Sequence, residues 1–331
     1  MANTAPLSPP TAHPARPDLA DVVRVVREHS GVTGKRHIAG VRRIVGTDDP
    51  LHGPGDDGAV VELDGARAVV CGEAIAPAFV TADPYGAGIA AVLANVNDIA
   101  AMGAVPHAIV NTLVGRAAEV DRVLDGMRDA AAIYRVPIVG GHLTASDGDA
   151  SLSAFALGQT RAPLSMAHVR PGQALLLLSC LHGTMRSDFP FFTTLEQQRE
   201  TLADDVRLLA GVAESGAAVA AKDVSMAGPL GSLAMLLEFT RHGAVVDLDA
   251  MPIPSGVDPL RWAVSFPTYS FWLTAAADRV PECLDRFAAH PHLTCAAVGE
   301  VTESSQVVLT QGSEHEVLMD LARESVTGLW A

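Results

Sequence analysis

A helix that begins at Asp83-Pro84 and runs to about Met102 constrains the fold more than any other segment of the chain. Asp83 is a favoured N-cap residue, and proline is favoured at the first helical position. Small residues follow at positions 86, 87, 88, 90 and 91. Because small side chains let another element approach closely, the sequence predicts that this helix packs tightly on a sheet or on another helix.

Polar side chains interrupt the same apolar helix at Asn95, Asn97 and Asp98. Asn95 and Asp98 lie three residues apart and therefore share one helix face. A carboxylate in apolar surroundings is costly unless it is paired or bound to a metal. A structural aspartate that accepts a backbone hydrogen bond would meet the same requirement, so the residues alone leave both roles open.

Strands and helices mix along the chain without a strict alternation, which favours an α+β fold over a doubly wound sheet. The proline-rich segment 1–17 is expected to be a disordered tail. A turn at Arg170-Pro171-Gly172 places the boundary between two domains, 18–167 and 168–331. In the first domain we expect helices over 18–29, 83–102 and 119–134, a flexible segment over 31–36, a hairpin of 59–63 with 67–71, and strands over 107–114, 136–139 and 152–158. In the second we expect strands over 174–179, 217–221, 244–248, 269–274, 295–301 and 307–309, and helices over 195–214, 230–242, 281–290 and 316–324.

Composition excludes several classes of protein. Of the 331 residues, 49% are hydrophobic and 18% are charged, which is typical of a folded chain and not of a disordered one. The formal net charge of −15 disfavours nucleic-acid partners. Four dispersed cysteines indicate reduced thiols. We see neither a secretory signal nor a membrane-spanning run, so we expect a cytoplasmic protein that does not contact a membrane.

The loop 52–60 carries the first candidate site, with Gly53 and Gly55 ahead of Asp56 and Asp57. Glycines let a backbone come close to a ligand, and adjacent carboxylates supply the hard oxygen ligands that Mg²⁺ prefers. An ordinary solvated turn would have the same composition, so this loop is informative only together with the other motifs.

Two further motifs stand at the ends of expected strands. Gly140-Gly141-His142 follows the strand over 136–139, where a glycine pair can cradle phosphate and a histidine can donate to it or move a proton. Lys222-Asp223 closes the strand over 217–221, and Gly228 precedes the next helix, an arrangement that suits an anion or a metal-bound nucleotide. A lone loop histidine and a surface salt bridge are the plain alternatives.

The order of these motifs resembles the superfamily of aminoimidazole ribonucleotide (AIR) synthase, also called PurM-like. Its relatives include thiamine-monophosphate kinase, selenophosphate synthetase, a hydrogenase-maturation dehydratase and formylglycinamidine ribonucleotide synthetase. The resemblance extends over about 30–310, its most specific part is Asn95–Gly103, and the sequence looks closest to the AIR-synthase-related subgroup.

The resemblance implies a homodimer of two-domain chains. In such a chain an N-terminal α/β domain forms a barrel-like dimer core, a C-terminal α+β domain follows, and Mg-ATP lies between them. The metal ligands it implies are Asp56, Asp57, Glu73, Asp98 and Asp223. The nucleotide-binding residues it implies are Gly53, Gly55, Asn95, Asn97, Asp98, Gly140, Gly141, Lys222 and Gly228. The catalytic residues it implies are Lys35, which would neutralise phosphate charge, His142, a phosphate donor or proton shuttle, and Asp223.

The expected activity is therefore Mg-ATP-dependent phosphoryl transfer to an oxygen of a small metabolite, by a kinase or by a carbonyl-activating synthetase. Glu73 stands where the superfamily has Asp, and Met226 stands where thiamine-monophosphate kinase has Asp. Two alternatives remain: a thiamine-monophosphate kinase, and a non-catalytic nucleotide-binding partner in a biosynthetic assembly. The segment 182–200, with Arg186, is a candidate site for the acceptor, although its phenylalanines would also fit plain packing.

Overall fold

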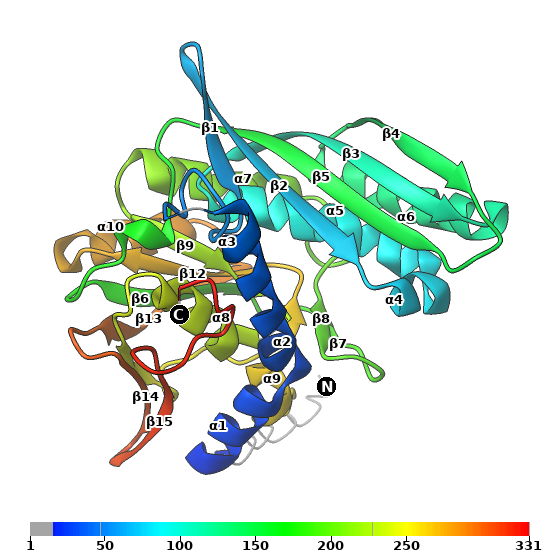
Figure 1. The fold of residues 1–331 in the computed structure, drawn as a ribbon. Helices are drawn as coiled ribbons and strands as arrows, with labels where there is room; N and C mark the ends of the chain where they lie inside the picture. The colour runs from blue at the N-terminus through cyan, green and yellow to red at the C-terminus, as the bar shows by residue number, and fades with distance from the viewer. Residues whose placement is uncertain (1–15, 47, 227, 331) are drawn as a thin grey trace, which may run out of the picture.

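The computed structural model describes residues 16–46, 48–226 and 228–330 (Figure 1). Residues 1–15 of the expected tail, 1–17, therefore lie outside the described residues. The elements up to residue 160 are α1 Leu19–Glu28, α2 Ser30–Thr33, η1 Gly34–Ile38, α3 Ala39–Val45, β1 Ala59–Leu63, β2 Ala66–Ile75, α4 Pro77–Ala82, α5 Pro84–Ala101, β3 Val105–Gly115, α6 Ala117–Tyr134, β4 Ile138–Ala145 and β5 Ser151–Thr160. The later elements are η2 Met166–His168, β6 Ala174–Cys180, β7 Thr184–Met185, β8 Phe191–Thr193, α7 Leu202–Glu214, β9 Ala220–Asp223, α8 Gly228–Glu238, β10 Ala244–Asp247, α9 Pro259–Ala263, β11 Phe266–Pro267, β12 Ser270–Ala275, η3 Ala277–Arg279, α10 Val280–Ala288, β13 Leu293–Val301, β14 Gln306–Gln311 and β15 Glu314–Asp320.

The first half of the chain builds a five-stranded sheet in the order β1-β2-β5-β3-β4. All neighbours in it are antiparallel except β3 and β4, which run parallel because α6 connects them. Helices α5 and α6 cover one face of this sheet (Figure 1). The Asp64-Gly65 hairpin predicted from the sequence joins β1 to β2.

The small residues of α5 bring it against α6, as predicted. A Cβ atom at Gly88 would lie 2.1 Å from the carbonyl oxygen of Val123, and one at Gly126 would lie 2.1 Å from that of Tyr85. The two helices therefore approach each other at a distance that only glycine permits. Asp83 caps α5 by accepting from the backbone N–H of Gly86 at 2.9 Å, which confirms the predicted N-cap.

The other face of the five-stranded sheet is apolar and exposed. Val70 is paired with Leu157, and Val110 is paired with Phe155, all four on the face turned away from α5 and α6. These side chains are each about two-fifths exposed and line a shallow hollow. A continuous apolar sheet face of this kind is typical of a surface that is covered in an assembly.

The second half of the chain builds a seven-stranded mixed sheet in the order β15-β14-β10-β13-β6-β12-β9. The apolar residues of β6 pack on both faces of this sheet. Leu176 and Leu178 belong to one hydrophobic core, and Leu175 and Leu177 belong to another. The first core also contains α5, α7 and α10 and is continuous with the core of the five-stranded sheet. The second core contains α1 and α8. Helix α5 thus lies between the two sheets and touches β9 at the edge of the larger one.

The two-domain α+β fold is confirmed, and the structure corrects several local predictions. The segment over 31–36 is helical, because η1 follows α2 directly and the His29 side chain caps α2. The segment over 316–324 is not a helix: β15 pairs with β14 across a turn at Gly312, whose φ is +58°. Helix α7 begins at Leu202 rather than at residue 195, and β4 extends to Ala145.

The four cysteines are free thiols, as predicted; Cys180 and Cys283 are buried and the other two are half-buried. Within the described residues, no helix has both the length and the apolar character needed to cross a membrane.

Candidate metal-nucleotide site

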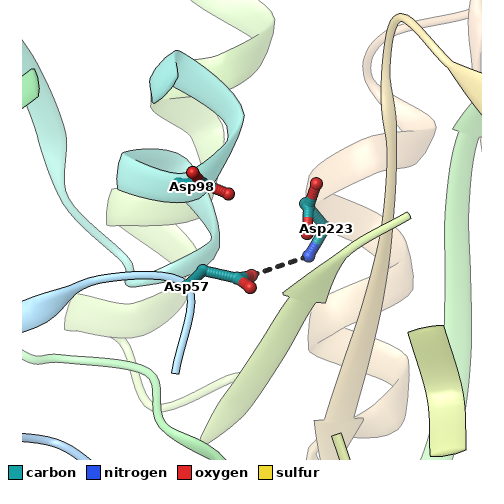
Figure 2. Close-up of side chains that lie close together, drawn as sticks. All are labelled: Asp57, Asp98 and Asp223. Carbon is teal, nitrogen blue, oxygen red and sulfur yellow. Dashed lines mark hydrogen bonds between the residues drawn. The ribbon is translucent and has the colours of Figure 1, made fainter. Parts of the chain in front are cut away.

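Three carboxylates from distant parts of the chain meet between the two sheets (Figure 2). Asp57 comes from the loop before β1, Asp98 from the last turns of α5, and Asp223 from the end of β9. Their ligand oxygens all lie within 4.8 Å of one another. The backbone N–H of Asp223 also donates to Asp57 at 2.9 Å, which fixes the loop to the strand. The structure therefore brings together three of the residues that the sequence analysis names as metal ligands.

Asp98 has the fewest hydrogen-bond and ion-pair partners in this carboxylate cluster. It is 6% exposed, and no donor among the described residues forms a hydrogen bond with its side chain. Burial raises the pKa of this carboxyl well above its usual range, and the charges of Asp223 and Asp57 raise it further. A cation placed among the three carboxylates would remove this electrostatic cost.

Lys222 supplies one cation to the cluster. Its ammonium group forms ion pairs with both Asp57 and Asp223. Burial alone would lower the pKa of Lys222, but these carboxylates raise it above its usual value. Burial raises the pKa of Asp57 to about 6, although Lys222 acts in the opposite direction. Lys222 is therefore held in its charged form beside two of the three acids.

Lys35 and Glu73 lie at the border of the cluster. Lys35, in η1, is half-buried. Its ammonium group interacts electrostatically with Lys222, Asp223, Glu73 and Asp57. Burial lowers the pKa of Lys35, and Lys222 lowers it further. Burial and the Asp223 charge raise the pKa of Glu73, which Lys35 opposes. Both side chains thus interact with the cluster, but Glu73 does not belong to the group of three close carboxylates.

Asp56 turns away from the neighbouring Asp57. Its carboxylate accepts from the Ser165 hydroxyl at 2.5 Å and from the Met166 backbone N–H at 3.1 Å. These contacts join the loop before β1 to η2. Asp56, predicted as a metal ligand, is thus engaged in protein hydrogen bonds outside the group of three close carboxylates.

The two asparagines of α5 make contacts within the protein. Asn95 donates to the Ala91 carbonyl at 2.8 Å and to the Ala154 carbonyl at 3.2 Å, which ties α5 to β5. Asn97 donates at 3.0 Å to the carbonyl of Thr268, in the second half of the chain. The side-chain oxygen of Asn97 is buried without a partner among the described residues. These bonds account for the burial of Asn95 without a ligand and leave one polar atom of Asn97 unexplained.

The predicted glycines differ in their surroundings. Gly53 lies in the bend before Asp56. Gly55 has a φ of +151°, and a Cβ atom there would lie 2.6 Å from the Trp330 ring, so packing alone requires glycine at this position. Gly228 opens α8 against the carbonyl of Ala263, where a Cβ atom would lie at 2.2 Å.

Gly140, Gly141 and His142 lie within β4 and not beyond the end of a strand, which corrects the prediction. All three are exposed on this edge strand. The register pairs His142 with Thr112 on the sheet face opposite α5 and α6, whereas the cluster lies on the helix side. Within one chain, the structure therefore separates this motif from the carboxylates.

The candidate acceptor segment over 182–200 is well anchored. Arg186 forms ion pairs with Asp188 at 2.8 Å and with Asp83 at 3.4 Å. The rings of Phe192 and Trp262 pack edge to face at 5.5 Å, and those of Phe191 and Phe266 pack at 5.3 Å. The structure thus supports packing for two of the three phenylalanines and joins Arg186 to the cap of α5.

Two partners of the site residues are not among the residues predicted from the sequence. Ser165 binds Asp56, and its only local signal is its place as the N-cap of η2. The Thr268 carbonyl binds Asn97 through its backbone, for which residue type gives no signal.

The cluster fits a divalent cation by its chemistry. Three carboxylates offer hard oxygen ligands, and the Asp98 carboxylate is buried with no hydrogen-bond donor in the described part of the chain. Mg²⁺ is usually bound by one or two carboxylates together with phosphate oxygens, so the same set suits a metal that carries a nucleotide.

Comparison with known proteins supports the same family over most of the chain. Residues 55–160 match AIR synthase related protein, N-terminal domain, and residues 170–311 match AIR synthase related protein, C-terminal domain. An uncharacterized protein of Synechocystis sp. is 32% identical over 318 residues, 94% of this chain and 98% of that protein. A thiamine-monophosphate kinase of Rhodopirellula baltica is 31% identical over 217 residues, 61% of this chain and 65% of the kinase.

A solved structure agrees in fold. PurL of T. maritima complexed with ATP has a TM-score of 0.71 at 21% identity and covers 92% of this chain and 52% of PurL, so this chain spans about half of that protein's length. Together with the two consecutive domain matches, these similarities bear out the resemblance carried by the motifs. The chain belongs to the AIR synthase-related family.

Proposed function

We propose that the chain is an enzyme that transfers a phosphoryl group from Mg-ATP to an oxygen of a small metabolite, as a kinase or to activate a carbonyl group. The observation that carries this proposal is the meeting of Asp57, Asp98 and Asp223 in one buried cluster. Carboxylates can serve a triphosphate only through a bridging cation, because both carry negative charge. The chain belongs to the AIR synthase-related family, and a protein of similar fold has been solved with bound ATP, which supports the same proposal.

Each residue of the site has a defined task in this proposal. Asp57, Asp98 and Asp223 would hold Mg²⁺, which would neutralise phosphate charge. Lys35, half-buried beside the cluster, is positioned to offset the charge that develops on the transferred group. Asn97 holds α5 against the second half of the chain and so keeps the three acids at a fixed spacing.

Mg²⁺-dependent ATP hydrolysis, with and without candidate acceptors, tests the proposal. We expect Asp98→Asn to lower kcat/KM for ATP at least about 100-fold, because the substitution removes a buried metal ligand without changing side-chain size. Asp64→Asn, a matched change in the exposed β1–β2 turn, should leave it unchanged. Equal rates in Asp98→Asn and wild-type protein would rule out the metal assignment, and tight ATP binding without any turnover would favour a non-catalytic partner.

Thiamine-monophosphate kinase is the second candidate, because a protein of that name is 31% identical to the chain. Met226 is 42% exposed in the turn that follows Asp223, at the position where the resemblance to thiamine-monophosphate kinase implies Asp. An assay with thiamine monophosphate decides between the two, since the specific kinase would phosphorylate it and an enzyme for another acceptor would not.

We further propose that the enzyme is a homodimer joined through the five-stranded sheet. The exposed apolar face formed by Val70, Val110, Phe155 and Leu157 supports this arrangement. A partner sheet on that face would bury it and would also cover the surface that bears His142.

A further inference from the structure

The use of lysine in this chain is unusual and points to the carboxylate cluster. Of the 23 lysine and arginine residues, only Lys35 and Lys222 are lysines. Both lie at the cluster, Lys222 in ion pairs with Asp57 and Asp223 and Lys35 within reach of the same charges. In the described part of the chain, every other ion pair uses arginine or His292. Lysine is thus confined to one place.

Lysine differs from arginine in a way that suits this place. An ammonium group is a compact point charge on a flexible stem, whereas a guanidinium group binds carboxylates through a planar, two-pronged contact. Lys222 and Asp223 are neighbours on β9, where side chains alternate between faces. The ammonium group nevertheless contacts the Asp223 carboxylate, because the lysine stem is long and flexible.

The position of Lys222 overlaps with that of a metal ion. Asp57 and Asp223 each contact its ammonium group, and these are two of the three carboxylates that could hold a cation. Asp98, the third, has no hydrogen-bond donor among the described residues. A divalent ion that binds all three carboxylates must therefore compete with the Lys222 ammonium group for Asp57 and Asp223.

We propose that Lys222 is the resident counter-ion of the carboxylate cluster and that a divalent cation displaces its ammonium group when it binds Asp57, Asp98 and Asp223. The inference rests on the proposed function, because it takes this cluster as the metal site. Lys222 holds the two halves of the chain together while the metal is absent. Once displaced, it is free to bind an anion such as a polyphosphate, so that metal and phosphate favour each other's binding.

Mn²⁺ titration by calorimetry, without nucleotide, tests the displacement. Lys222→Met should bind Mn²⁺ about tenfold or more tightly than the wild-type protein, because the competing charge is gone. Lys222→Arg, which keeps the charge, should stay near or below the wild-type affinity. Equal or weaker Mn²⁺ binding by Lys222→Met, or no binding by either protein, would overturn the inference.

A second measurement needs no variant. With only two lysines and the N-terminus to modify, acetylation by an amine-reactive ester is read residue by residue in a mass spectrometer. Lys222 should react slowly in metal-free protein and several-fold faster at saturating Mn²⁺, since its ammonium group is released. An unchanged or slower reaction would overturn the inference. Both experiments omit nucleotide, so their result is independent of whether ATP proves to be the substrate.

Discussion

Asp56 and Asp57 are neighbours in sequence with separate surroundings in the fold. Asp57 faces Lys222 and Asp223, whereas Asp56 faces Ser165 and Met166. Burial raises the pKa of Asp56 to about 7, although the hydrogen bond from Ser165 opposes the shift. The folded protein therefore favours the protonated form of Asp56, and this preference gives the residue a measurable effect on stability.

The stability of the metal-free protein should fall as the pH rises. The pKa of Asp56 is about 7 in the folded protein against a model value of 3.8, so between these values the folded state holds a proton that the unfolded state has lost. The free energy of unfolding should decrease between pH 5 and pH 7.5 by roughly 1–3 kcal/mol. Urea unfolding in the presence of a chelator at pH 5 and pH 7.5 measures it.

Asp56→Asn provides the control for this effect. The amide resembles the protonated carboxyl and does not titrate, so the variant should lose a large part of the difference between the two pH values. A difference as large as that of the wild-type protein would show that Asp56 is not its source.

Residue type and spacing identified the acids of the site but not their partners. Asp98 could be predicted because a carboxylate in an apolar helix needs a cation or a donor. Asp57 and Asp223 could be flagged by the glycines and the strand end beside them. The two ion pairs of Lys222 and the direction of the Asp56 side chain, away from the cluster, could not be predicted. The direction of each side chain depends on how the two sheets meet.

Helix α5 is the element on which the site depends. Its start bears the Asp83 cap that Arg186 contacts, its first turns pack closely on α6, and its last turns hold Asp98 at the cluster. Its start, its end and its close packing were all predictable, since N-cap chemistry and small residues act locally. Strand β15 was not predictable, because the local sequence is compatible with a helix and pairing with β14 overrides this preference.

Gly88→Ala should destabilise the protein strongly. The added Cβ atom would lie 2.1 Å from a backbone oxygen of α6, so the helices must separate, at a cost of about 3 kcal/mol. Gly211→Ala is the matched control, since Gly211 lies inside α7 with nothing within 4 Å of its Cβ position, and alanine there should stabilise by up to about 1 kcal/mol. Equal urea midpoints for the two variants would contradict the close crossing of α5 and α6.

The exposed apolar face of the five-stranded sheet predicts that the protein is a dimer. Leu157→Glu places a charge in the middle of the exposed sheet face and should convert the dimer to a monomer, because an unpaired charge in an apolar interface is costly. Leu124→Glu is the control, since Leu124 is similarly exposed on α6, on the other side of the same sheet. Sedimentation velocity measures the mass of each protein; a dimeric Leu157→Glu variant would exclude this face as the interface.

The carboxylate cluster depends on both halves of the chain. Asp57 and Asp98 come from the first half and Asp223 from the second, so the cluster exists only when the domains are docked. The family resemblance anticipated a site between domains, but which carboxylates approach one another depends on the docking itself. Glu73 and Asp56 were expected in the same set and lie beside it and outside it, respectively.

A crystal structure with Mn²⁺ and a non-hydrolysable ATP analogue would show whether the three carboxylates hold a metal-bound nucleotide. We expect an anomalous peak at about 2.2 Å from an oxygen of each of Asp57, Asp98 and Asp223, with the phosphates on the same ion. A metal bound elsewhere, or a nucleotide bound with no ion at these three carboxylates, would contradict it.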